Sequence, residues 1–287
     1  MIHRVTEREL LKKACVLAEK TRRELDEAGL SPDDFCGIAR RYSVELTWDS
    51  LPDDNPGCYV KERKRIVLDP SAQSPERLNF TFFHELMHDR IEHNDNMLSM
   101  LADAYVSSDE IVMERLCNAG AAELLIPTAD LRKTLQECEF STGCIPVLCE
   151  RYSASSIAVA FKMISAVSHN CFLVIAEPRF VAPENNGVPM LLEAPAVDGQ
   201  CKLLIIYSAT SPGMRKYSIK IGQQVASDHP MYDALGQNGQ IVQGQAKIPF
   251  ASGRPWSVKF DALFYRSKVF AFFHVSSPVS ANQLPLL

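Results

Sequence analysis

The chain has 287 residues, of which 46% are hydrophobic and 23% are charged, and it carries a formal net charge of −5. These values are typical of a folded globular protein and exclude a disordered or collagen-like chain. The first eight residues lack the apolar core of a signal peptide, and no apolar stretch reaches the roughly 18 residues that a membrane span needs. The nine cysteines form no CxxC pair, so we expect a protein of the reducing cytoplasm that contacts no membrane.

Amphipathic helices followed by short strands are predicted at the start of the chain. Apolar residues recur at helical spacing up to Gly29, and Ser31-Pro32 opens a second helix. A charged turn at 61–63 separates two short runs that are typical of a hairpin. The predicted elements are helices over 6–28 and 31–42 and strands over 44–48, 58–60 and 64–68.

The next predicted helix, over 75–92, carries the run His84-Glu85-Leu86-Met87-His88. Ser74-Pro75 supplies an N-cap and a proline at the first helical position. Side chains four residues apart share one face of a helix, so His84 and His88 can place two imidazole nitrogens on one metal ion. Glu85, one residue round, can reach a water at that metal. The segment therefore predicts a zinc hydrolase site.

A mononuclear zinc site of this kind needs a third protein ligand and an open fourth position. Position 94, where a further histidine would stand in one class of zinc proteases, is Asn94, and His93 falls one residue early. We interpret His93 as a surface histidine near the helix end. The alternative ligand is a carboxylate from a later helix, and helices are predicted over 96–107, 109–125 and 128–138. Spacing alone leaves three candidates open: Glu110, Glu114 and Glu123.

The run F-T-F-F-H-E-L-M-H followed by E-R-L-C-N-A-G-A-A-E-L-L-I-P closely resembles the ImmA/IrrE metallopeptidases. The pattern of that family is an HExxH helix followed by E-x-x-A-N-x-F-A-A-x-x-L-L-x-P. The upstream I-V-L-D-P-S resembles the strand and turn that precede the active-site helix. The resemblance is specific over 56–127 and selects Glu114 as the third ligand. Cys117 in place of the usual alanine and Gly120 in place of the usual aromatic are departures that remove no ligand.

This resemblance implies zinc, or manganese in its place, held by His84, His88 and Glu114. Glu85 would take the proton of the attacking water and pass it to the leaving amine. Asn118, one turn after Glu114, is a candidate for orienting a ligand, with helix packing as the alternative. Candidates for a second donor to the oxyanion are Tyr59, Tyr105 and His93.

Two further expectations concern the surroundings of this site. In zinc peptidases a strand beside the active helix pairs with the substrate backbone, and 65–69 is the natural candidate. Cys58, in the hairpin beside the cleft, could fill the open position of the metal as a thiolate and hold the enzyme inactive. Cys117 is the second candidate for this role, and a small buried hydrophobe is the plainer interpretation of each cysteine.

Residues 144–166 are predicted to form a helix, a polar turn and a second helix. The second helix offers Ser155, Ser156 and Lys162 among apolar residues, so we expect it to pack rather than to read DNA bases. IrrE-like relatives carry a similar helix-turn-helix motif in this position. We therefore predict a helical linker over 139–167 between a peptidase domain, 1–138, and a C-terminal domain, 168–287.

The C-terminal part is rich in predicted strands and differs in charge. Residues 1–167 hold 20 basic and 28 acidic residues, a net charge of −8, whereas 168–287 hold 10 and 7, a net charge of +3. The strands are predicted over 171–175, 202–207, 217–221, 257–260 and 269–273. They predict a mixed sheet, and the resemblance implies a GAF-like sensory domain. The overall class is thus α+β, with a zincin-like, mostly helical peptidase domain and a small sheet.

Polar residues of the C-terminal part give weaker signals. Arg215, Lys216 and Lys220 are candidate anion contacts for single-stranded DNA or a small-molecule activator, although ordinary solvated charges are the alternative. The histidines at 169, 229 and 274 lie far apart in the sequence without metal spacing, so we expect surface or core roles for them.

Proteins of the ImmA/IrrE family typically cleave a partner transcriptional repressor, often a small helix-turn-helix protein. The resemblance thus implies a cytoplasmic zinc endopeptidase that derepresses stress, DNA-damage or antiphage genes and is gated by its C-terminal domain. The alternative is a non-catalytic DNA- or partner-binding regulator that uses the zinc domain as a scaffold.

Overall fold

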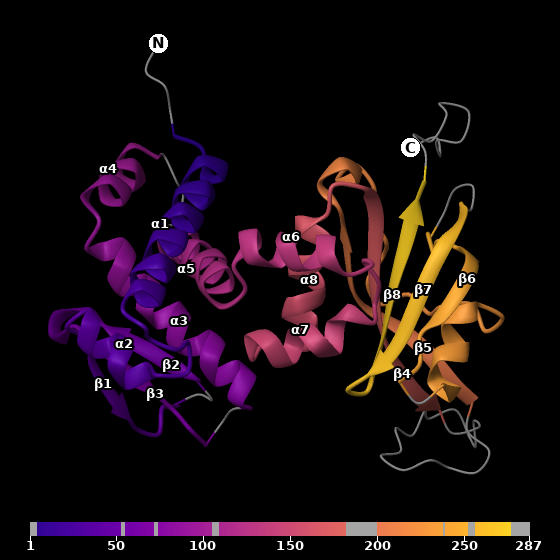
Figure 1. Ribbon diagram of the computed structural model, residues 1–287, viewed down its shortest axis with the longest axis horizontal. Coiled ribbons are helices and arrows are strands. Elements are labelled where there is room, and N and C mark those ends of the chain that lie inside the picture. Colours follow the sequence, from indigo (N-terminus) through magenta and orange to yellow (C-terminus); the bar gives the residue numbers. More distant parts are fainter. Residues whose placement is uncertain are drawn as a thin grey trace. The chain divides into compact units, whose positions relative to one another are not determined.

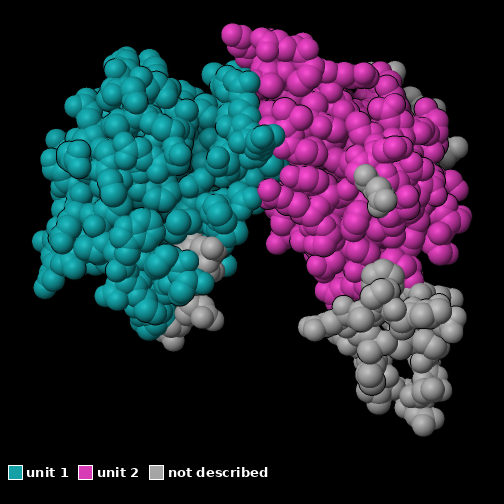
Figure 2. Space-filling view, turned by 60° about the horizontal axis from the view of Figure 1, so that its bottom comes forward, with its two compact units in different colours: residues 1–130, 149–155 teal, residues 131–148, 156–287 magenta. Residues whose placement is uncertain are grey.

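The computed structural model describes residues 5–52, 55–71, 74–104, 109–181, 200–237, 239–251 and 256–276. The chain forms two compact units, one of residues 1–130 and 149–155 and the other of residues 131–148 and 156–287 (Figure 2). The predicted division at 139 and 168 into three functional domains stays a prediction. Among the helices of the described residues, none combines the length and apolar composition that crossing a membrane requires.

The first unit begins with two capped helices that follow the predicted pattern. In α1 (Glu7–Glu27) the Thr6 hydroxyl accepts from the backbone N–H of Glu9, whose carboxylate accepts from Thr6 in return. The helix α2 (Phe35–Arg41) starts later than predicted because the Asp34 side chain caps it through the backbone N–H of Gly37. These caps satisfy backbone donors that would otherwise lack partners, which fixes where each helix starts.

Three short strands form the small sheet of the first unit (Figure 1). They are β1 (Glu45–Trp48), β2 (Gly57–Val60) and β3 (Arg65–Leu68). The order is β1-β3-β2, with β1 parallel and β2 antiparallel to β3. The predicted charged turn is a 3-10 helix over Lys61–Arg63, closed by Lys64 at a φ of 49°. The predicted hairpin is confirmed, and β2 lies at the edge of the sheet.

The remaining helices of this part of the chain agree with the predicted segments. They are α3 (Pro75–Glu92), α4 (Asp95–Asp103), α5 (Asp109–Leu125), α6 (Thr128–Glu137), α7 (Cys144–Tyr152) and α8 (Ser156–Ala166). The predicted 96–107 helix ends in α4 at Asp103, and Tyr105 lies outside the described residues. The predicted helix, turn and helix over 144–166 is confirmed in α7 and α8.

The packing of α3 against α5 positions the candidate site. Phe82, Phe83, Leu86 and Met87 of α3 are completely buried. A Cβ added to Gly120 of α5 would lie 2.5 Å from the end of the Met87 side chain and 2.9 Å from its Cγ. The absence of a side chain at Gly120 therefore lets the two helices approach closely, and Met87 occupies the space.

The second unit is built on a five-stranded sheet in the order β5-β4-β8-β7-β6 (Figure 1). Its strands are β4 (Asn170–Val181), β5 (Gln200–Thr210), β6 (Val242–Lys247), β7 (Ser257–Tyr265) and β8 (Lys268–Val275). The α+β class is confirmed, but every pairing in this sheet is antiparallel rather than mixed. Parallel neighbours need long crossover connections, usually helical, and the described residues after β4 contain only short 3-10 helices.

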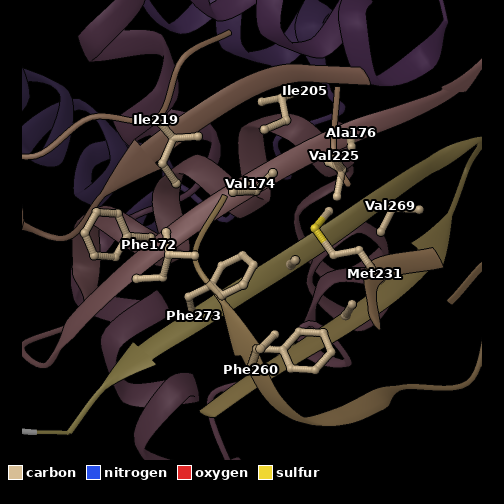
Figure 3. Packing of buried hydrophobic residues seen from close by; sticks show 14 of the residues in the cluster. Phe172, Val174, Ala176, Ile205, Ile219, Val225, Met231, Phe260, Val269 and Phe273 are labelled. Carbon is tan, nitrogen blue, oxygen red and sulfur yellow. The ribbon is translucent and has the colours of Figure 1, made fainter. Parts of the chain in front are cut away.

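The two faces of this sheet bury different side chains. One face carries a core that includes Phe172, Val174, Val269 and Phe273, with Met231 packed over the strands (Figure 3). The alternate residues of β4 and β8, such as Cys171 and Phe272, are also completely buried, and α8 contacts β4 and β5. The strands are thus buried on both faces, which explains their nearly continuous apolar runs.

One strand prediction in this unit was wrong, and one strand was missed. Residues 217–221 form no strand, although Ile219 is buried, and the neighbouring Gln224 makes a single bridge to Leu204. The structure instead has β6 over 242–247, whose polar side chains are mostly exposed at the edge of the sheet. An exposed edge strand of this kind has no apolar alternation, so hydropathy does not reveal it.

Candidate metal centre and active site

One face of α3 lines a polar pocket in the first unit. Ser74 caps the helix by accepting from the Arg77 N–H, and from there Arg77, Thr81, His84 and His88 recur at helical spacing. The pocket has a volume of about 490 Å³. Its walls come from the segment before and within β2, from α3 and from α5: Asn55, Pro56, Gly57, Cys58, Tyr59, Arg77, Phe80, Thr81, His84, Glu85, His88, Glu114 and Asn118.

Three side chains converge at the floor of this pocket. The Nε2 atoms of His84 and His88 lie 3.2 Å apart. The Glu114 carboxylate places one oxygen 3.2 Å from His84 Nε2 and the other 3.2 Å from His88 Nε2. Ligands at about 2.0–2.1 Å around a tetrahedral ion are separated by roughly 3.3 Å, so the spacing of these donors fits a zinc-sized ion.

The imidazole of His84 is oriented from its other side. Asn118 Oδ1 lies 3.1 Å from His84 Nδ1, and we assign the ring proton to Nδ1 because the amide oxygen can only accept. This hydrogen bond leaves the lone pair of His84 Nε2 directed at Glu114 and His88. Asn118 and Glu114 stand one turn apart on α5, so a single helix face supplies both contacts.

Glu85 lies beside these residues and is buried. Burial and the nearby Glu114 carboxylate raise the pKa of Glu85 to about 8, while a hydrogen bond from the Tyr59 backbone N–H opposes that shift. Burial, and then the proximity of His84, lower the pKa of His88, which favours the neutral imidazole with a lone pair to share. A carboxyl with a pKa near neutrality beside a set of metal-ligating atoms is suited to moving protons.

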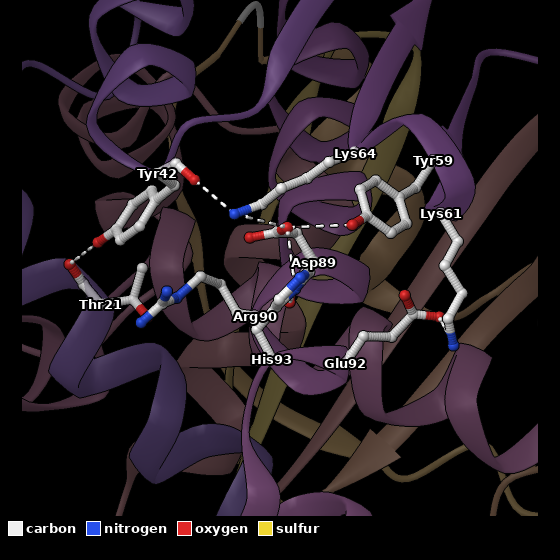
Figure 4. A network of polar contacts seen from close by, with 9 residues as sticks. All are labelled: Thr21, Tyr42, Tyr59, Lys61, Lys64, Asp89, Arg90, Glu92 and His93. Carbon is white, nitrogen blue, oxygen red and sulfur yellow. Dashed lines mark hydrogen bonds and ion pairs between the residues drawn. The ribbon is translucent and has the colours of Figure 1, made fainter.

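Behind the pocket, Asp89 gathers a network of polar side chains (Figure 4). The Tyr59 hydroxyl donates to Asp89 at 3.0 Å, and His93 Nδ1 lies 3.2 Å from the same carboxylate. Lys64 pairs with Asp89 at 3.7 Å and donates to the Tyr42 carbonyl at 2.8 Å. The Tyr59 ring stacks on His88 with centroids 6.4 Å apart. The network therefore fixes the position of the β2 strand against the α3 helix.

This network engages two of the predicted oxyanion donors. The hydroxyl of Tyr59 is directed at Asp89, and burial together with Asp89 raises its pKa. His93 also contacts Asp89 and is not among the residues that line the pocket. Arg77 does line the pocket and was not among the predicted site residues. It lies seven residues before His84, on the same face of α3, so the helical period could have indicated it.

The structure separates the three carboxylates that spacing left open. Glu114 contacts both histidines, and its side chain is half exposed. Glu123 is buried on α5 and accepts from the backbone N–H and hydroxyl of Thr128 at 2.7 and 2.6 Å, so it caps α6. Glu110 is exposed and does not line the pocket. Of the three, only Glu114 is placed to share an ion with His84 and His88.

The two candidate inhibitory cysteines differ in their surroundings. Cys58 lines the pocket, and burial and Glu85 raise its pKa, so its thiol is not activated in the absence of a cation. Cys117 is completely buried on α5, does not line the pocket, and also has a pKa raised by burial and Glu114. Cys58 is thus the better placed of the two.

The expectation that β3 meets the substrate was wrong in one respect. The strand β3, which covers most of 65–69, is the central strand and is paired on both sides. Its backbone hydrogen-bonding groups are therefore already used by β1 and β2. The strand with an open edge that also lines the pocket is β2, through Gly57, Cys58 and Tyr59.

The second unit contains the remaining predicted residues. Arg215, Lys216 and Lys220 are exposed, and the Lys216 ammonium lies 5.2 Å from the centroid of the Tyr217 ring. Two of the histidines that are far apart in the sequence are close together in the fold. The pairing of β4 with β8 brings the rings of His169 and His274 to a centroid distance of 5.7 Å. His229 stands separately and donates from Nε2 to the Lys247 carbonyl at 2.8 Å.

Comparison with known proteins agrees with this geometry. Residues 39–163 match the family described as the IrrE N-terminal-like domain. The radiation response metalloprotease IrrE of Deinococcus radiodurans is 28% identical over 198 residues, which are 69% of this chain and 59% of the relative. The protein of the same name from Deinococcus deserti is 29% identical over 218 residues, 76% of this chain and 73% of the relative. The chain thus spans less than two thirds of the first relative's length.

A solved structure is similar over most of the chain. It is described as a Mycobacterium tuberculosis transcriptional regulator and has a TM-score of 0.52 at 15% sequence identity. The similarity covers 90% of this chain and 76% of that one. At this identity the comparison shows a shared fold.

Proposed function

We propose, on the premise that residues 39–163 are an IrrE N-terminal-like domain and the chain is a distant relative of IrrE, that this protein is a metal-dependent endopeptidase. The observation that carries the proposal is the convergence of His84, His88 and Glu114 within 3.2 Å beside the buried Glu85. Structural packing alone would not need four ionisable groups directed at one point of an open pocket.

Each residue of the pocket has a role in this proposal. His84, His88 and Glu114 would hold the ion, zinc or manganese, and Asn118 holds His84 in the tautomer that leaves Nε2 free. A bound ion of this kind lowers the pKa of a water and polarises the substrate carbonyl. Glu85 takes the proton of the water on its carboxylate and returns it to the amine of the departing peptide. A bound cation also favours the ionised form of Glu85, which is the form that accepts a proton.

The substrate of this enzyme is an extended protein segment. The β2 strand is an edge of its sheet, and apart from the Tyr59 N–H, which donates to Glu85, backbone groups on its outer side can pair with an added strand. Gly57, Cys58 and Tyr59 of this edge line the same pocket as His84 and Glu85. A Cβ on Gly57 would come within 2.5 Å of Thr81, so β2 lies close against α3. Pairing on this edge would place a peptide bond next to the ion.

The partner that we infer is a helix-turn-helix transcriptional repressor whose cleavage derepresses stress, DNA-damage or antiphage genes. The name of the curated relatives, radiation response metalloprotease, supports the link to a stress response. Gating by the C-terminal part, through single-stranded DNA or a small molecule near Arg215, Lys216 and Lys220, belongs to the same proposal. The positive charge of that part supports an anionic signal.

A cleavage assay of the Glu85→Gln variant tests the proposal. The native protein and the variant are each mixed with the repressor encoded beside the gene, and the products are followed by intact mass. We expect one discrete cut by the native protein and none by the variant, with equal metal content in both. Glutamine has the shape of glutamate but cannot take a proton, so loss of cleavage with metal retained identifies the proton carrier.

A second class of function would give a different result. If the metal domain is a scaffold for a DNA- or partner-binding regulator, Glu85→Gln would retain repressor binding and regulation in full. Cleavage by the variant at the native rate, or a native protein that binds no metal, would overturn the enzymatic proposal.

The inhibitory role of Cys58 has its own test. A Cys58 thiolate in the open coordination position of the metal would keep water from binding there. Cys58→Ser is therefore expected to raise the basal rate of cleavage. Cys36→Ser, at an exposed cysteine on α2, is the matched control. Equal basal rates in the native protein and both variants would exclude the cysteine gate while leaving the peptidase proposal intact.

A further inference from the structure

We propose that the second unit carries a separate transition-metal site formed by His169, Cys171 and His274. Their ligand atoms, one from each residue, lie within 4.8 Å of one another. None of the three residues lines the pocket that contains His84, Glu85 and His88, which we call the HExxH pocket. The site is independent of the proposed peptidase activity and would bind its own ion.

Strand pairing explains how these residues meet. Cys171 on β4 stands directly opposite His274 on the antiparallel strand β8. His169 lies in the bend just before β4, two residues before Cys171. The two imidazole rings are stacked, with centroids 5.7 Å apart and an interplanar angle of 26°. Cys171 of β4 and His274 of β8 thus share one face of the sheet, and His169 reaches them from the segment that precedes β4.

Asp261 of β7 orients one of the ligands. Its carboxylate lies 2.6 Å from His274 Nε2 and accepts from the Thr142 backbone N–H at 2.5 Å. We assign a proton to His274 Nε2 because the carboxylate can only accept, which leaves the lone pair on Nδ1. A carboxylate that holds the far nitrogen of an imidazole is the usual support of a metal-ligating histidine. The arrangement therefore has both a ligand set and its outer support.

The chemistry of the donors selects the ion. One thiolate and two imidazoles suit zinc and other late transition metals, whereas magnesium and calcium prefer oxygen ligands. Binding would release the thiol proton of Cys171 to solvent and form a metal–thiolate bond. The donors of a tetrahedral ion lie closer to one another than the 4.8 Å that encloses these three ligand atoms. Because His169 is exposed, its side chain can rotate and bring its ring nitrogen nearer to the other two ligands.

Two other interpretations explain less of the structure. Cys171, His274 and Asp261 have the composition of a nucleophile triad, but Cys171 is completely buried and a peptide could not reach it. An aromatic cluster accounts for Phe140, which packs edge-on against both histidines at 5.0 and 5.9 Å. It does not account for a carboxylate that is only 3% exposed in the same cluster. His274 and Thr142 hydrogen-bond this carboxylate, and a cation held by His274 would further compensate its charge.

An ion has a route to this site. A pocket of about 430 Å³ opens beside it, lined by His169, Phe140, Ser168 and Gly213 among others. The three ligands leave a fourth position for a water or a small anion, as in metal sites that exchange ligands. Because Asp261 also holds Thr142, in the connection between α6 and α7, metal binding would stiffen that connection against the sheet.

Cobalt binding to the full-length protein tests this site. A thiolate ligand gives Co²⁺ an intense charge-transfer band in the near ultraviolet, which His and Glu ligands alone do not give. The titration uses His88→Ala, which removes a ligand of the first site. We expect one equivalent of Co²⁺ with the thiolate band in this background, and loss of the band when Cys171→Ser is added.

Control variants separate the site from its alternatives. Cys58→Ser should keep the band, since Cys58 belongs to the HExxH pocket. His169→Ala, a change at an exposed residue, should weaken Co²⁺ binding at least tenfold without altering the thermal stability of the metal-free protein. The absence of a thiolate band in His88→Ala, its persistence in Cys171→Ser, or its loss in Cys58→Ser would each overturn the proposal. None of these results depends on whether the first site cleaves peptides.

Discussion

Asn118 contributes to the candidate centre without being a ligand. Its amide oxygen accepts from His84 Nδ1 at 3.1 Å and so directs Nε2 at the other two donors. We expect Asn118→Ala to weaken zinc binding about 10- to 100-fold, the usual effect of removing such a partner. Asn118→Asp keeps the acceptor and should retain most of the affinity. Competition with a chromogenic chelator measures both, and equal weakening in the two variants would mean that Asn118 acts through helix packing instead.

Glu85 gives the metal-free protein a predictable pH dependence. Its pKa is raised to about 8 in the folded state from an ordinary value near 4.5, so the folded protein holds this proton more tightly than the unfolded chain. The stabilising contribution is complete below about pH 4.5 and is lost as the pH rises through 8, on the order of a few kcal/mol in all.

Urea unfolding of chelator-treated protein between pH 5 and 8 measures this effect. The free energy of unfolding of the native protein should fall relative to Glu85→Gln as the pH rises across this interval. Addition of zinc should reduce the difference, because a cation beside Glu85 favours its charged form. Parallel curves for the native protein and the variant would show that Glu85 does not titrate in this window.

The residues of the first site differ in how far the sequence predicts them. The helical period is enough to predict that His84 and His88 share one face of α3 and that Glu85 lies beside them. Glu114 required the family pattern, because contacts between helices distant in the chain cannot be read from spacing. The cluster of His169, Cys171 and His274 was missed entirely, since only the pairing of β4 with β8 brings these residues together.

At the scale of elements, the approach of α5 to α3 depends on Gly120. A side chain there would meet Met87, which is completely buried. We expect Gly120→Leu to destabilise the first unit by about 1–3 kcal/mol through overpacking and to weaken metal binding by displacing Glu114. Thermal and urea unfolding measure the first effect, and chelator competition measures the second.

A double-mutant cycle tests the cause of that effect. Met87→Ala alone leaves a cavity and should cost about 2–5 kcal/mol. If the leucine of Gly120→Leu clashes with Met87, the double variant Gly120→Leu, Met87→Ala should lose less free energy of unfolding than the two single variants lose in sum. Additive costs would place the clash elsewhere.

Strands were predicted less well than helices, and the reason is physical. The helices carry caps and a period that are local in sequence, as at Ser74-Pro75. Whether a segment pairs depends on partners far along the chain, so the alternating run at 217–221 stays unpaired while the polar 242–247 becomes the edge strand β6. For the same reason, the sequence did not reveal that β3 is the central strand of the small sheet and β2 an edge strand.

At the scale of the whole molecule, charge separates the two parts of the chain. Residues 1–167 have a net charge of −8 and 168–287 a net charge of +3. An anionic signal such as single-stranded DNA would therefore be attracted to the C-terminal part and repelled from the part that carries the candidate peptidase. The exposed Arg215, Lys216 and Lys220 are the proposed contacts.

Binding of a fluorescent oligothymidylate to the full-length protein, measured by anisotropy at several salt concentrations, tests these contacts. Replacing Arg215, Lys216 and Lys220 together by alanine should weaken binding and reduce the slope of log K against log salt by about 2, because each lost phosphate contact with a single strand removes roughly 0.7. The matched control replaces Lys12, Lys13 and Lys20, exposed on α1. A larger loss in the control than in the test variant would place the anion site in the first unit, and no binding by the native protein would direct the search for a signal to small molecules.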